Sequence, residues 1–381
     1  MKRFRILILL ALLVFAGLPV AAQKISKGEI SGVAMHDAYV PSFENDGSEQ
    51  KPLNVILMIG DGMGLAHLST GMYANGGELT ITNLKTCGWV RTQSSSDFTT
   101  DSAASGTAYA TGCKTHNEAI GVDKDDKPIA NLPEKLSKLG IVSGVVTTDD
   151  MDGATPSSFF AHQPSRNMKD GIWADLADAA IIFFAGGKLE DFEDVDAKTA
   201  KAIKERYHIT HEFPTEKDAE KDCLGYLPPR SETASMSTGR GDFLPSSTAY
   251  AIDFLQSKSS EGKGFFLMVE GARIDKSSHS NDFPSMVKEV LDFDKAVEAA
   301  IRFAEQDGRT LVIISTDHET GALSLGDGEP EKGNMKGAFS SGSHTGIPVP
   351  LFAYGPCSQY FMGVQENSDV SNKIEALLSD K

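Results

Sequence analysis

Apolar runs of strand length recur along the chain, and each is apolar throughout rather than alternating with polar residues. A continuous run of this kind is typical of a β-strand that is buried on both faces. The predicted strands are Pro52–Ile59, Ile141–Thr148, Ile181–Phe184, Gly264–Val269, Thr310–Ser315 and Val349–Tyr354. Helical patterns separate them, and the predicted helices are Leu132–Leu139, Asp175–Ala180, Thr248–Gln256 and the long amphipathic Pro284–Gln306. This alternation predicts an α/β fold, a three-layer sandwich with a central, mostly parallel sheet and helices on both faces.

Three stretches lack that pattern. Residues 23–51 are polar and rich in glycine and serine, and we expect a flexible leader there. From Glu190 to about Lys221 the chain is rich in charged residues, which favours surface helices and loops. Gly326–Ser343 is rich in glycine, and we expect an irregular excursion. The length suits one large or two smaller α/β domains, and we expect one domain over residues 52–381.

The first 22 residues have the features of a secretory signal peptide. Lys2, Arg3 and Arg5 precede an apolar run, and small residues suited to cleavage end at Ala22. An uncleaved anchor is the alternative, but the apolar run is short for a membrane span. We therefore expect an exported protein, periplasmic or secreted, whose mature chain has no membrane span.

The net charge of −17 becomes −20 when a signal peptide with three basic residues and no acidic ones is removed. Such a charge argues against nucleic acids and anionic membranes as partners. It would also repel a phosphate, so an anion site in this chain must be locally positive, most simply through metal ions. The four cysteines form no Cys-x-x-Cys pair, and both disulfides and buried thiols stay open for Cys87, Cys113, Cys223 and Cys357.

The stretch Thr99–Ala108 contains the first candidate for chemistry, Ser102. An alanine-rich run follows Asp101 and Ser102 and predicts a helix that ends at Gly112. Ser102 then lies in the first turn, where free N–H groups and the helix dipole favour an alkoxide or a phosphate oxygen. The alternative is that Asp101 or Ser102 is only a helix N-cap.

Acidic residues and histidines follow the ends of four apolar runs, and they are Asp61, Glu270, Asp275, His279, Asp317, His318 and His344. Ligands of parallel sheets gather outside the carboxyl ends of the strands, so these side chains are expected to meet. Asp275 and His279 share a helix face and can bind one ion. Carboxylate and imidazole ligands suit Zn²⁺, whereas an all-oxygen set suits Mg²⁺. Each of these residues taken alone also has an ordinary role in a turn or on the surface.

Seven sequence blocks occur in an order that closely resembles the alkaline phosphatases, and they are Asn54–Gly64, Thr100–Ala104, Ala154–Pro156, Ala161–Arg166, Val269–His279, Thr316–His318 and His344–Gly346. The resemblance extends from about Pro52 to Pro356 and is weak between Asp191 and Arg240. It implies that residues 52–381 form a catalytic domain of that family. The implied activity is hydrolysis of small-molecule phosphate monoesters with broad substrate tolerance.

The resemblance also implies roles for individual residues. Ser102 matches the nucleophile that forms a covalent phosphoserine, and Arg166 matches the guanidinium that clamps two phosphate oxygens. Lys276 matches a lysine found near the phosphate in some bacterial members. The implied metals are two zinc ions and one magnesium ion. Their implied ligands are Asp275, His279 and His344 for the first zinc, Asp61, Asp317 and His318 for the second zinc, and Asp61, Thr155 and Glu270 for magnesium.

The chain departs from the family pattern at Gly153, where related enzymes often have an aspartate or a histidine that helps to hold magnesium. We expect a weak magnesium site, with the alternative that Asp150 or Asp152 restores the missing group. The stretches from Arg166 to Glu270 and from His318 to His344 are short, so a homodimer like that of the family stays an open expectation.

Two other functions compete with that of a phosphomonoesterase. A phosphodiesterase or a sulfatase of the same superfamily is the main alternative, but such relatives typically use threonine or a modified cysteine where this chain has Ser102. An exported metal-binding protein with a decayed site is disfavoured, because the nucleophile, the clamp and the metal ligands are all present.

Overall fold

The computed structural model describes residues 25–187 and 189–379. The predicted signal peptide, residues 1–22, lies outside this part of the chain. Within the described residues, no helix combines the length and the apolar character that a membrane crossing requires. All four cysteines are free thiols there, two of them exposed, one half-buried and one buried.

A ten-stranded sheet forms the centre of the described chain, in the order β15-β3-β14-β9-β2-β8-β4-β5-β7-β6. The seven strands from β9 to β6 run parallel, whereas β14 is antiparallel to both of its neighbours. The strands are β2 (Asn54–Gly60), β3 (Thr86–Arg91), β4 (Val142–Thr147), β5 (Phe183–Ala185), β6 (His208–Thr210), β7 (Leu224–Tyr226), β8 (Phe265–Gly271), β9 (Thr310–Ser315), β14 (Val349–Tyr354) and β15 (Gly363–Glu366). The mostly parallel sheet expected from the sequence is confirmed.

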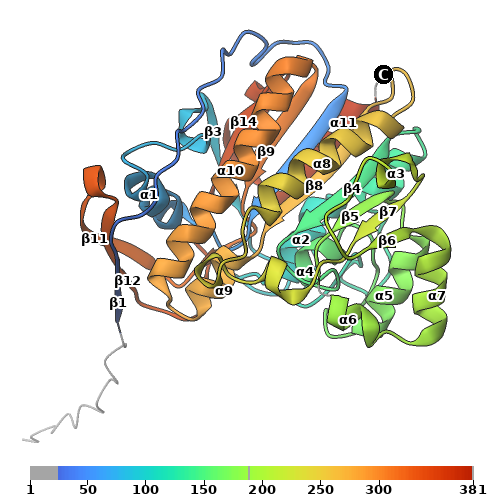
Figure 1. Cartoon of the computed structure of the whole chain (residues 1–381), viewed down its shortest axis with the longest axis horizontal. Coiled ribbons are helices and arrows are strands. Elements are labelled where there is room, and N and C mark those ends of the chain that lie inside the picture. The colour runs from blue at the N-terminus through green and yellow to red at the C-terminus, as the bar shows by residue number, and fades with distance from the viewer. Residues whose placement is uncertain (1–24, 188, 380–381) are drawn as a thin grey trace, which may run out of the picture.

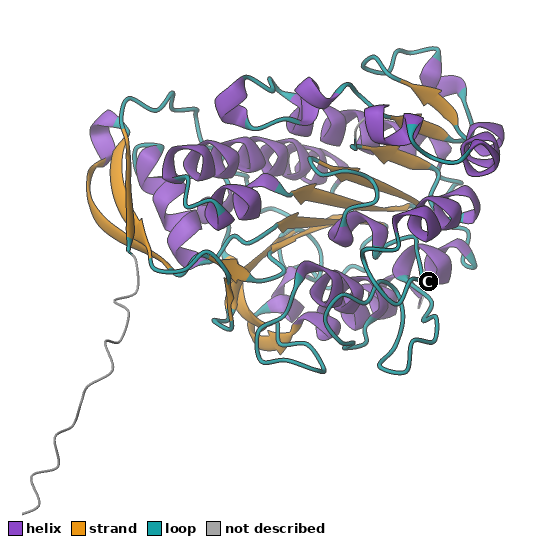
Figure 2. Cartoon of the chain, turned by 90° about the horizontal axis from the view of Figure 1, so that it is seen from below, coloured by secondary structure: helices purple, strands orange, loops and turns teal. Residues whose placement is uncertain are grey.

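Helices cover both faces of the sheet, as the edge-on view in Figure 2 shows. One face packs on α1 (Leu65–Ala74), α8 (Phe243–Lys258) and α10 (Phe283–Asp307), and the last two cross in front of the strands in Figure 1. The other face packs on α2 (Ser102–Thr111), α3 (Leu132–Ser137), α5 (Lys169–Asp178) and α11 (Asn367–Ser379). Short helices α4 (Ala154–Ser157) and α9 (Arg273–His279) lie in loops, and α6 (Leu189–Glu193) and α7 (Ala197–Arg206) precede β6. The predicted three-layer sandwich is therefore confirmed.

The alternation of side chains along β2 explains why its sequence is apolar throughout. Val55, Leu57 and Ile59 belong to one hydrophobic core, whereas Ile56 and Met58 belong to the core on the opposite face. Because successive strand residues point to opposite faces, a strand between two helical layers needs an apolar residue at every position.

Four strands of the sheet were missed by the sequence analysis. β6 and β7 have three residues each, and β6 lies inside the charged stretch that we expected to be helix and loop. β3 alternates buried and exposed residues, and β15 has one buried residue among four. β3, β6 and β15 lie toward the two ends of the strand order and have exposed or half-buried residues, whereas β7 is buried but has only three residues. None of the four therefore has the long, continuous apolar run that identifies a central strand.

The expected leader and the expected irregular excursion together form a second sheet, which corrects both expectations. β1 (Ser26–Ile30) pairs with β12 (Asn334–Phe339), which pairs with β11 (Leu323–Glu329). The sheet lies beside the main body in Figure 1. A Cβ on Gly28 would lie 2.3 Å from Phe283 Cβ, and one on Gly337 would lie 2.4 Å from Phe283 Cε2. Glycine, which suggested a loop, is needed here because the strands lie directly against α10.

The rest of the expected leader, residues 31–51, forms a strap that is fixed to the domain. His36 Nε2 lies 2.9 Å from Asp294 Oδ2 on α10, and the Tyr39 backbone N–H donates to Thr80 Oγ1 over 3.1 Å. Asp294 is fully buried and also accepts hydrogen bonds from the backbone N–H groups of Thr80 and Ile81, each over 3.0 Å. One carboxylate on α10 thus joins the strap to the helix and to the loop before β3.

We expect Asp294→Ala to lower the free energy of unfolding by about 3 kcal/mol, because it leaves buried N–H groups without an acceptor. The measurement is urea unfolding. Glu298→Ala on the same helix is the matched control, since its ion pair with Arg302 is partly exposed and its loss should cost less than about 1 kcal/mol. Equal losses in the two variants would contradict this role of Asp294.

Candidate active site

The carboxyl ends of β2, β8 and β9 bring acidic residues to one edge of the sheet. These three strands are parallel neighbours, and Ile59 on β2 is in register with both Glu270 and Ser315. Asp61 directly follows Gly60, the last residue of β2. Glu270 is the penultimate residue of β8, and Asp317 is the second residue after β9. All three carboxylates are buried. The topology predicted from the sequence therefore gathers these residues where parallel sheets place their ligands.

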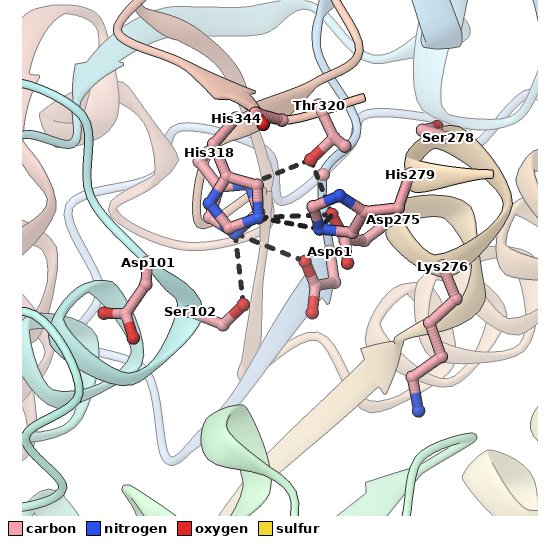
Figure 3. Close-up of polar contacts among 12 residues, drawn as sticks. Asp61, Asp101, Ser102, Asp275, Lys276, Ser278, His279, His318, Thr320 and His344 are labelled. Atoms are coloured by element: carbon pink, nitrogen blue, oxygen red, sulfur yellow. Dashed lines mark hydrogen bonds and ion pairs between the residues drawn. The ribbon is translucent and has the colours of Figure 1, made fainter. Parts of the chain in front are cut away.

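Three predicted ligands, Asp275, His279 and His344, form one group. Asp275 and His279 lie four residues apart on α9, and His279 Nε2 is 3.3 Å from Asp275 Oδ1. His344 reaches the same carboxylate from β13 (His344–Thr345), with 3.6 Å between His344 Nε2 and Asp275 Oδ1. The two imidazole Nε2 atoms are 3.0 Å apart. Figure 3 shows these side chains pointing toward one another.

Hydrogen bonds to backbone carbonyls fix the tautomers of both imidazoles. His279 Nδ1 donates to the Gly342 carbonyl over 2.8 Å, and His344 Nδ1 donates to the Thr100 carbonyl over 2.9 Å. Burial and then the neighbouring His318 lower the pKa of His344 to about 4, so this ring is neutral at neutral pH. With Nδ1 donating in both rings, the Nε2 atoms face the same space. Such an arrangement suits a cation between the rings, and orienting hydrogen bonds of this kind are typical of metal-ligating histidines.

His318 lies at the centre of a second group. Its Nε2 atom is 3.1 Å from Asp317 Oδ2, 3.6 Å from Asp61 Oδ1 and 3.1 Å from Ser102 Oγ. Its Nδ1 atom is 3.2 Å from Thr320 Oγ1, which donates to Asp275 Oδ1 over 2.5 Å. The hydroxyl of Thr320 therefore accepts from His318 and joins the two groups. Thr320 is absent from the ligand set predicted for the second zinc, because nothing in the sequence Asp-His-Glu-Thr indicates a role for the threonine.

Two clusters of side chains have the geometry to hold a metal ion among the described residues. One is Asp275, His279 and His344, and the other is Asp61, Asp275 and His318, with ligand atoms within 4.8 Å of one another in each. The second cluster contains Asp275, which the sequence analysis placed with the first ion only. Asp317, expected in that second set, contacts His318 directly. Sharing of Asp275 places the two clusters side by side.

Four predicted ligands also have a buried oxygen without a hydrogen-bond partner, and these atoms are Asp61 Oδ1, Thr155 Oγ1, Glu270 Oε1 and Asp317 Oδ2. Buried polar atoms are rarely left without a partner. Glu270 Oε2, by contrast, accepts from the Thr147 hydroxyl. The unpartnered oxygens belong to carboxylates and a hydroxyl, which are the donors that Zn²⁺ and Mg²⁺ bind, so the residues present fit the expected ions.

Burial and mutual repulsion together raise the pKa of two of these carboxylates. Burial, followed by the charges of Asp317 and Asp275, raises the pKa of Asp61 well above its usual value. Burial and then the charge of Asp149 raise the pKa of Glu270 to about 8. Neighbouring carboxylates therefore add to the effect of burial on both of these groups. Positive ions bound at this edge would relieve the repulsion.

Ser102 lies at the start of α2, as expected. Asp101 is the N-cap of this helix, and its Oδ1 accepts from the Ala104 backbone N–H over 2.9 Å. Gly112 ends the helix with a left-handed conformation, φ 81°. The dipole and the free N–H groups of α2 therefore point to the region where Ser102 Oγ meets His318. Asp101 is therefore the N-cap of this helix, and Ser102 Oγ lies beside the second cluster.

Arg166 approaches the same region and has a partner that the sequence analysis did not identify. Its Nη1 atom is 3.5 Å from Asp101 Oδ2, and that oxygen also accepts from the Glu118 backbone N–H over 3.0 Å. The Arg166 side chain is 35% exposed, so its guanidinium remains available to a ligand. Asp101 thus connects the helix start with Arg166. Its position one residue before Ser102 was the only available signal.

Lys276 lies on α9 and extends away from the imidazoles in Figure 3. Its Nζ atom pairs with Asp149 Oδ1, and its side chain is 42% exposed. Thr155 is buried on α4, next to α2. The structure therefore brings Ser102 together with six of the predicted metal ligands, which are Asp61, Asp275, His279, Asp317, His318 and His344. Arg166 and Lys276 instead pair with Asp101 and Asp149, respectively.

Comparison with known proteins agrees with this geometry. The model of the family "Alkaline phosphatase" matches residues 52–180 and 243–337. Alkaline phosphatase 4 of Bacillus subtilis (strain 168) is 30% identical over 95% of this chain and 96% of its own length. The alkaline phosphatase of Escherichia coli (strain K12) is 28% identical over 96% and 95%, respectively. The chain belongs to the alkaline phosphatase family.

As an alkaline phosphatase, this protein is a phosphoric monoester hydrolase. The solved alkaline phosphatase of the Antarctic bacterium TAB5 matches with a TM-score of 0.81 and 35% identity, covering 87% of this chain and 99% of that one. Variants of the TAB5 enzyme, in which a histidine is replaced by glutamate or aspartate, have been solved with Mg bound in the M3 site. The family model leaves residues 181–242 unmatched, which agrees with the weak resemblance expected between Asp191 and Arg240.

The two contacts of Asp101 can be separated by substitution. We expect Asp101→Ala to lower the free energy of unfolding by about 1 kcal/mol, because the N-cap of α2 is lost. Asp101→Asn keeps a capping oxygen and should keep this stability, but it removes the charge that faces Arg166. Both variants should therefore bind inorganic phosphate differently from the wild type, as measured by competitive inhibition. Loss of stability in Asp101→Asn equal to that in Asp101→Ala would contradict the capping role.

Proposed function

We propose that this alkaline phosphatase transfers the phosphoryl group of a small-molecule phosphate monoester first to Ser102 and then to water. The proposal includes two zinc ions and one magnesium ion. The observation that carries it is the placement of Ser102 Oγ, 3.1 Å from His318 Nε2 and beside two clusters of side chains with metal-ligand geometry. We further propose that the protein is exported to the periplasm, consistent with its predicted signal peptide.

The proposed ligand sets follow the sequence analysis. They are Asp275, His279 and His344 for the first zinc, Asp61, Asp317 and His318 for the second zinc, and Asp61, Thr155 and Glu270 for magnesium. When bound, such a zinc pair supplies positive charge that stabilises the attacking and leaving oxygens of an in-line displacement. The unpartnered oxygens of Asp61, Thr155, Glu270 and Asp317 support these sets.

The first step forms the bond between Ser102 Oγ and phosphorus and breaks the bond between phosphorus and the ester oxygen. The serine proton is lost, and the leaving alcohol gains a proton from water. The start of α2 stabilises charge on the serine oxygen and on the phosphoryl group, because its N–H groups and dipole face them. In the second step water attacks phosphoserine, inorganic phosphate leaves and the Ser102 hydroxyl is restored. Two such steps are easier than one direct hydrolysis.

Arg166 is proposed to bind two oxygens of the transferring group with its planar guanidinium. Asp101 limits the directions in which this guanidinium can point, because it contacts Arg166 and is itself fixed by two backbone N–H groups. Lys276 is proposed to add a positive charge near the phosphate. These contacts favour a doubly charged monoester, which presents more negative oxygens than a diester does.

We expect Ser102→Ala to reduce phosphomonoester turnover by at least about 1,000-fold, because the covalent step loses its nucleophile. Zinc content, measured by atomic emission, should stay at the wild-type value. Acid-quenched wild-type enzyme should carry phosphoserine after reaction with labelled substrate, whereas the variant should carry none. Near-wild-type turnover in a zinc-loaded Ser102→Ala enzyme would contradict the assignment of Ser102 as the nucleophile.

Substitution of Arg166 and of His344 should affect different properties. Arg166→Ala is expected to weaken inhibition by phosphate by about 10- to 100-fold, the equivalent of lost hydrogen bonds to a charged group, with zinc retained. Arg166→Lys should recover only part of this loss, because a point charge cannot make two parallel hydrogen bonds.

His344→Ala should instead lower the number of zinc ions bound per chain. Metal analysis after gel filtration and the inhibition constant for phosphate provide the two measurements. The roles would be wrongly assigned if Arg166→Ala lost zinc while His344→Ala kept it.

A further inference from the structure

The loop between β4 and α4 has no side chain at Gly153, two residues before the predicted magnesium ligand Thr155. The backbone at Gly153 is extended, with φ −62° and ψ 158°, so its conformation does not require glycine. Space does. A Cβ atom on Gly153 would lie 2.4 Å from Asp149 Oδ2 and 2.8 Å from Asp149 Cγ. The carboxylate of Asp149 therefore fills the position that a side chain on residue 153 would take.

Contacts on both sides hold the Asp149 carboxylate in this position. Its Oδ1 pairs with Lys276 Nζ, and its side chain is 14% exposed. Its backbone N–H donates to Thr147 Oγ1 over 2.8 Å, and the Thr147 hydroxyl donates to Glu270 Oε2. The Asp149 carbonyl accepts from the Gly187 N–H over 2.6 Å. A continuous set of contacts thus connects Lys276, at the proposed phosphate site, with Glu270, at the proposed magnesium site.

The other two acidic residues of this loop make different contacts. Asp152 Oδ1 lies 3.3 Å from Lys169 Nζ on α5. The Asp150 carbonyl accepts from the Gly153 N–H over 2.7 Å and closes the turn. The sequence analysis considered Asp150 or Asp152 as the replacement for the missing side chain. The contacts around Gly153 and Lys276 favour Asp149 instead.

Building on the proposed function, we propose that Asp149 is the positioning residue for both the magnesium site and Lys276, in place of the side chain that Gly153 lacks. Glu270 Oε1 and Thr155 Oγ1 are buried and unpartnered, and the Asp149 carboxylate lies near enough to Glu270 for its charge to act on that residue. Mg²⁺ keeps several of its waters when it binds to proteins, so a nearby carboxylate can hold it through that water shell. The same carboxylate sets the direction of the Lys276 ammonium group.

The test is a calorimetric titration of Mg²⁺ into zinc-loaded, magnesium-free protein. Asp149→Asn should weaken Mg²⁺ binding by about 10- to 100-fold, the range found for outer partners of metal ligands. Asp152→Asn is the matched control from the same loop and should leave the Mg²⁺ affinity unchanged. In activity assays, Asp149→Asn should lower kcat at limiting Mg²⁺, and excess Mg²⁺ should restore most of it.

A second pair of variants covers the case in which Asp149→Asn folds poorly. Asp149→Ala combined with Gly153→Asp should bind Mg²⁺ more tightly than Asp149→Ala alone, because the new carboxylate enters the space that Asp149 leaves. Gly153→Asp alone should be less stable to urea than the wild type, since its Cβ would overlap the Asp149 carboxylate.

Equal Mg²⁺ affinity in the wild type and in Asp149→Asn would overturn this assignment and leave the proposed function standing. An equal loss in Asp149→Asn and Asp152→Asn would also overturn it. A wild-type protein that binds no Mg²⁺ would instead overturn the magnesium part of the proposed function, and this assignment with it.

Discussion

The burial of like charges at one edge of the sheet is the constraint on which the rest of the site depends. Asp61, Glu270, Asp275 and Asp317 are all less than one-tenth exposed, and each belongs to or follows an element that the sheet positions. A buried carboxylate is costly unless a cation or several hydrogen-bond donors accompany it. The side chains around these four residues provide few donors, and several of their oxygens have none. Metal ions are the simplest counter-charge for such an arrangement.

The scaffold must bring these groups close without adding atoms between them, and glycine makes this possible. Gly62 has φ +72°, and a Cβ there would lie 2.9 Å from Asp275 Cβ and 2.8 Å from Thr320 Oγ1. The loop after β2 can therefore approach α9 only if this residue is glycine. Gly106 on α2 has a similar function, because a Cβ there would lie 2.9 Å from Ser158 Oγ and 3.3 Å from Thr155 Cα. Close packing of α2 on α4 brings the start of the Ser102 helix beside Thr155.

Regions outside the site are tied to α10, the long helix that covers one face of the sheet. Asp294 holds the strap, and Phe283 packs against the second sheet. Arg240 belongs to the segment that the family model leaves unmatched, and it contacts Glu289 over 2.7 Å and Asp292 over 2.5 Å, all three side chains being buried. Removing one partner from such a buried group leaves an uncompensated charge, which is costly. These contacts therefore fix the position of the segment that contains Arg240 on α10. A segment that the family model does not match is thus anchored to α10, which lies within the matched range.

The sequence by itself determined the central strands and the layer order, and it named the candidate metal ligands. Periodicity reveals a strand when both of its faces are buried, as for β2 and β9, and the order of motifs reveals residues whose chemistry allows few substitutes. It could not reveal β1 and β12, whose glycines reflect contact with Phe283, nor the partners Asp101, Thr320 and Asp149. Those roles depend on contacts between residues far apart in the sequence or on the direction of a side chain in a loop. Only the tertiary structure decides such contacts, and it alone distinguishes Asp149 from two other aspartates within three residues of it.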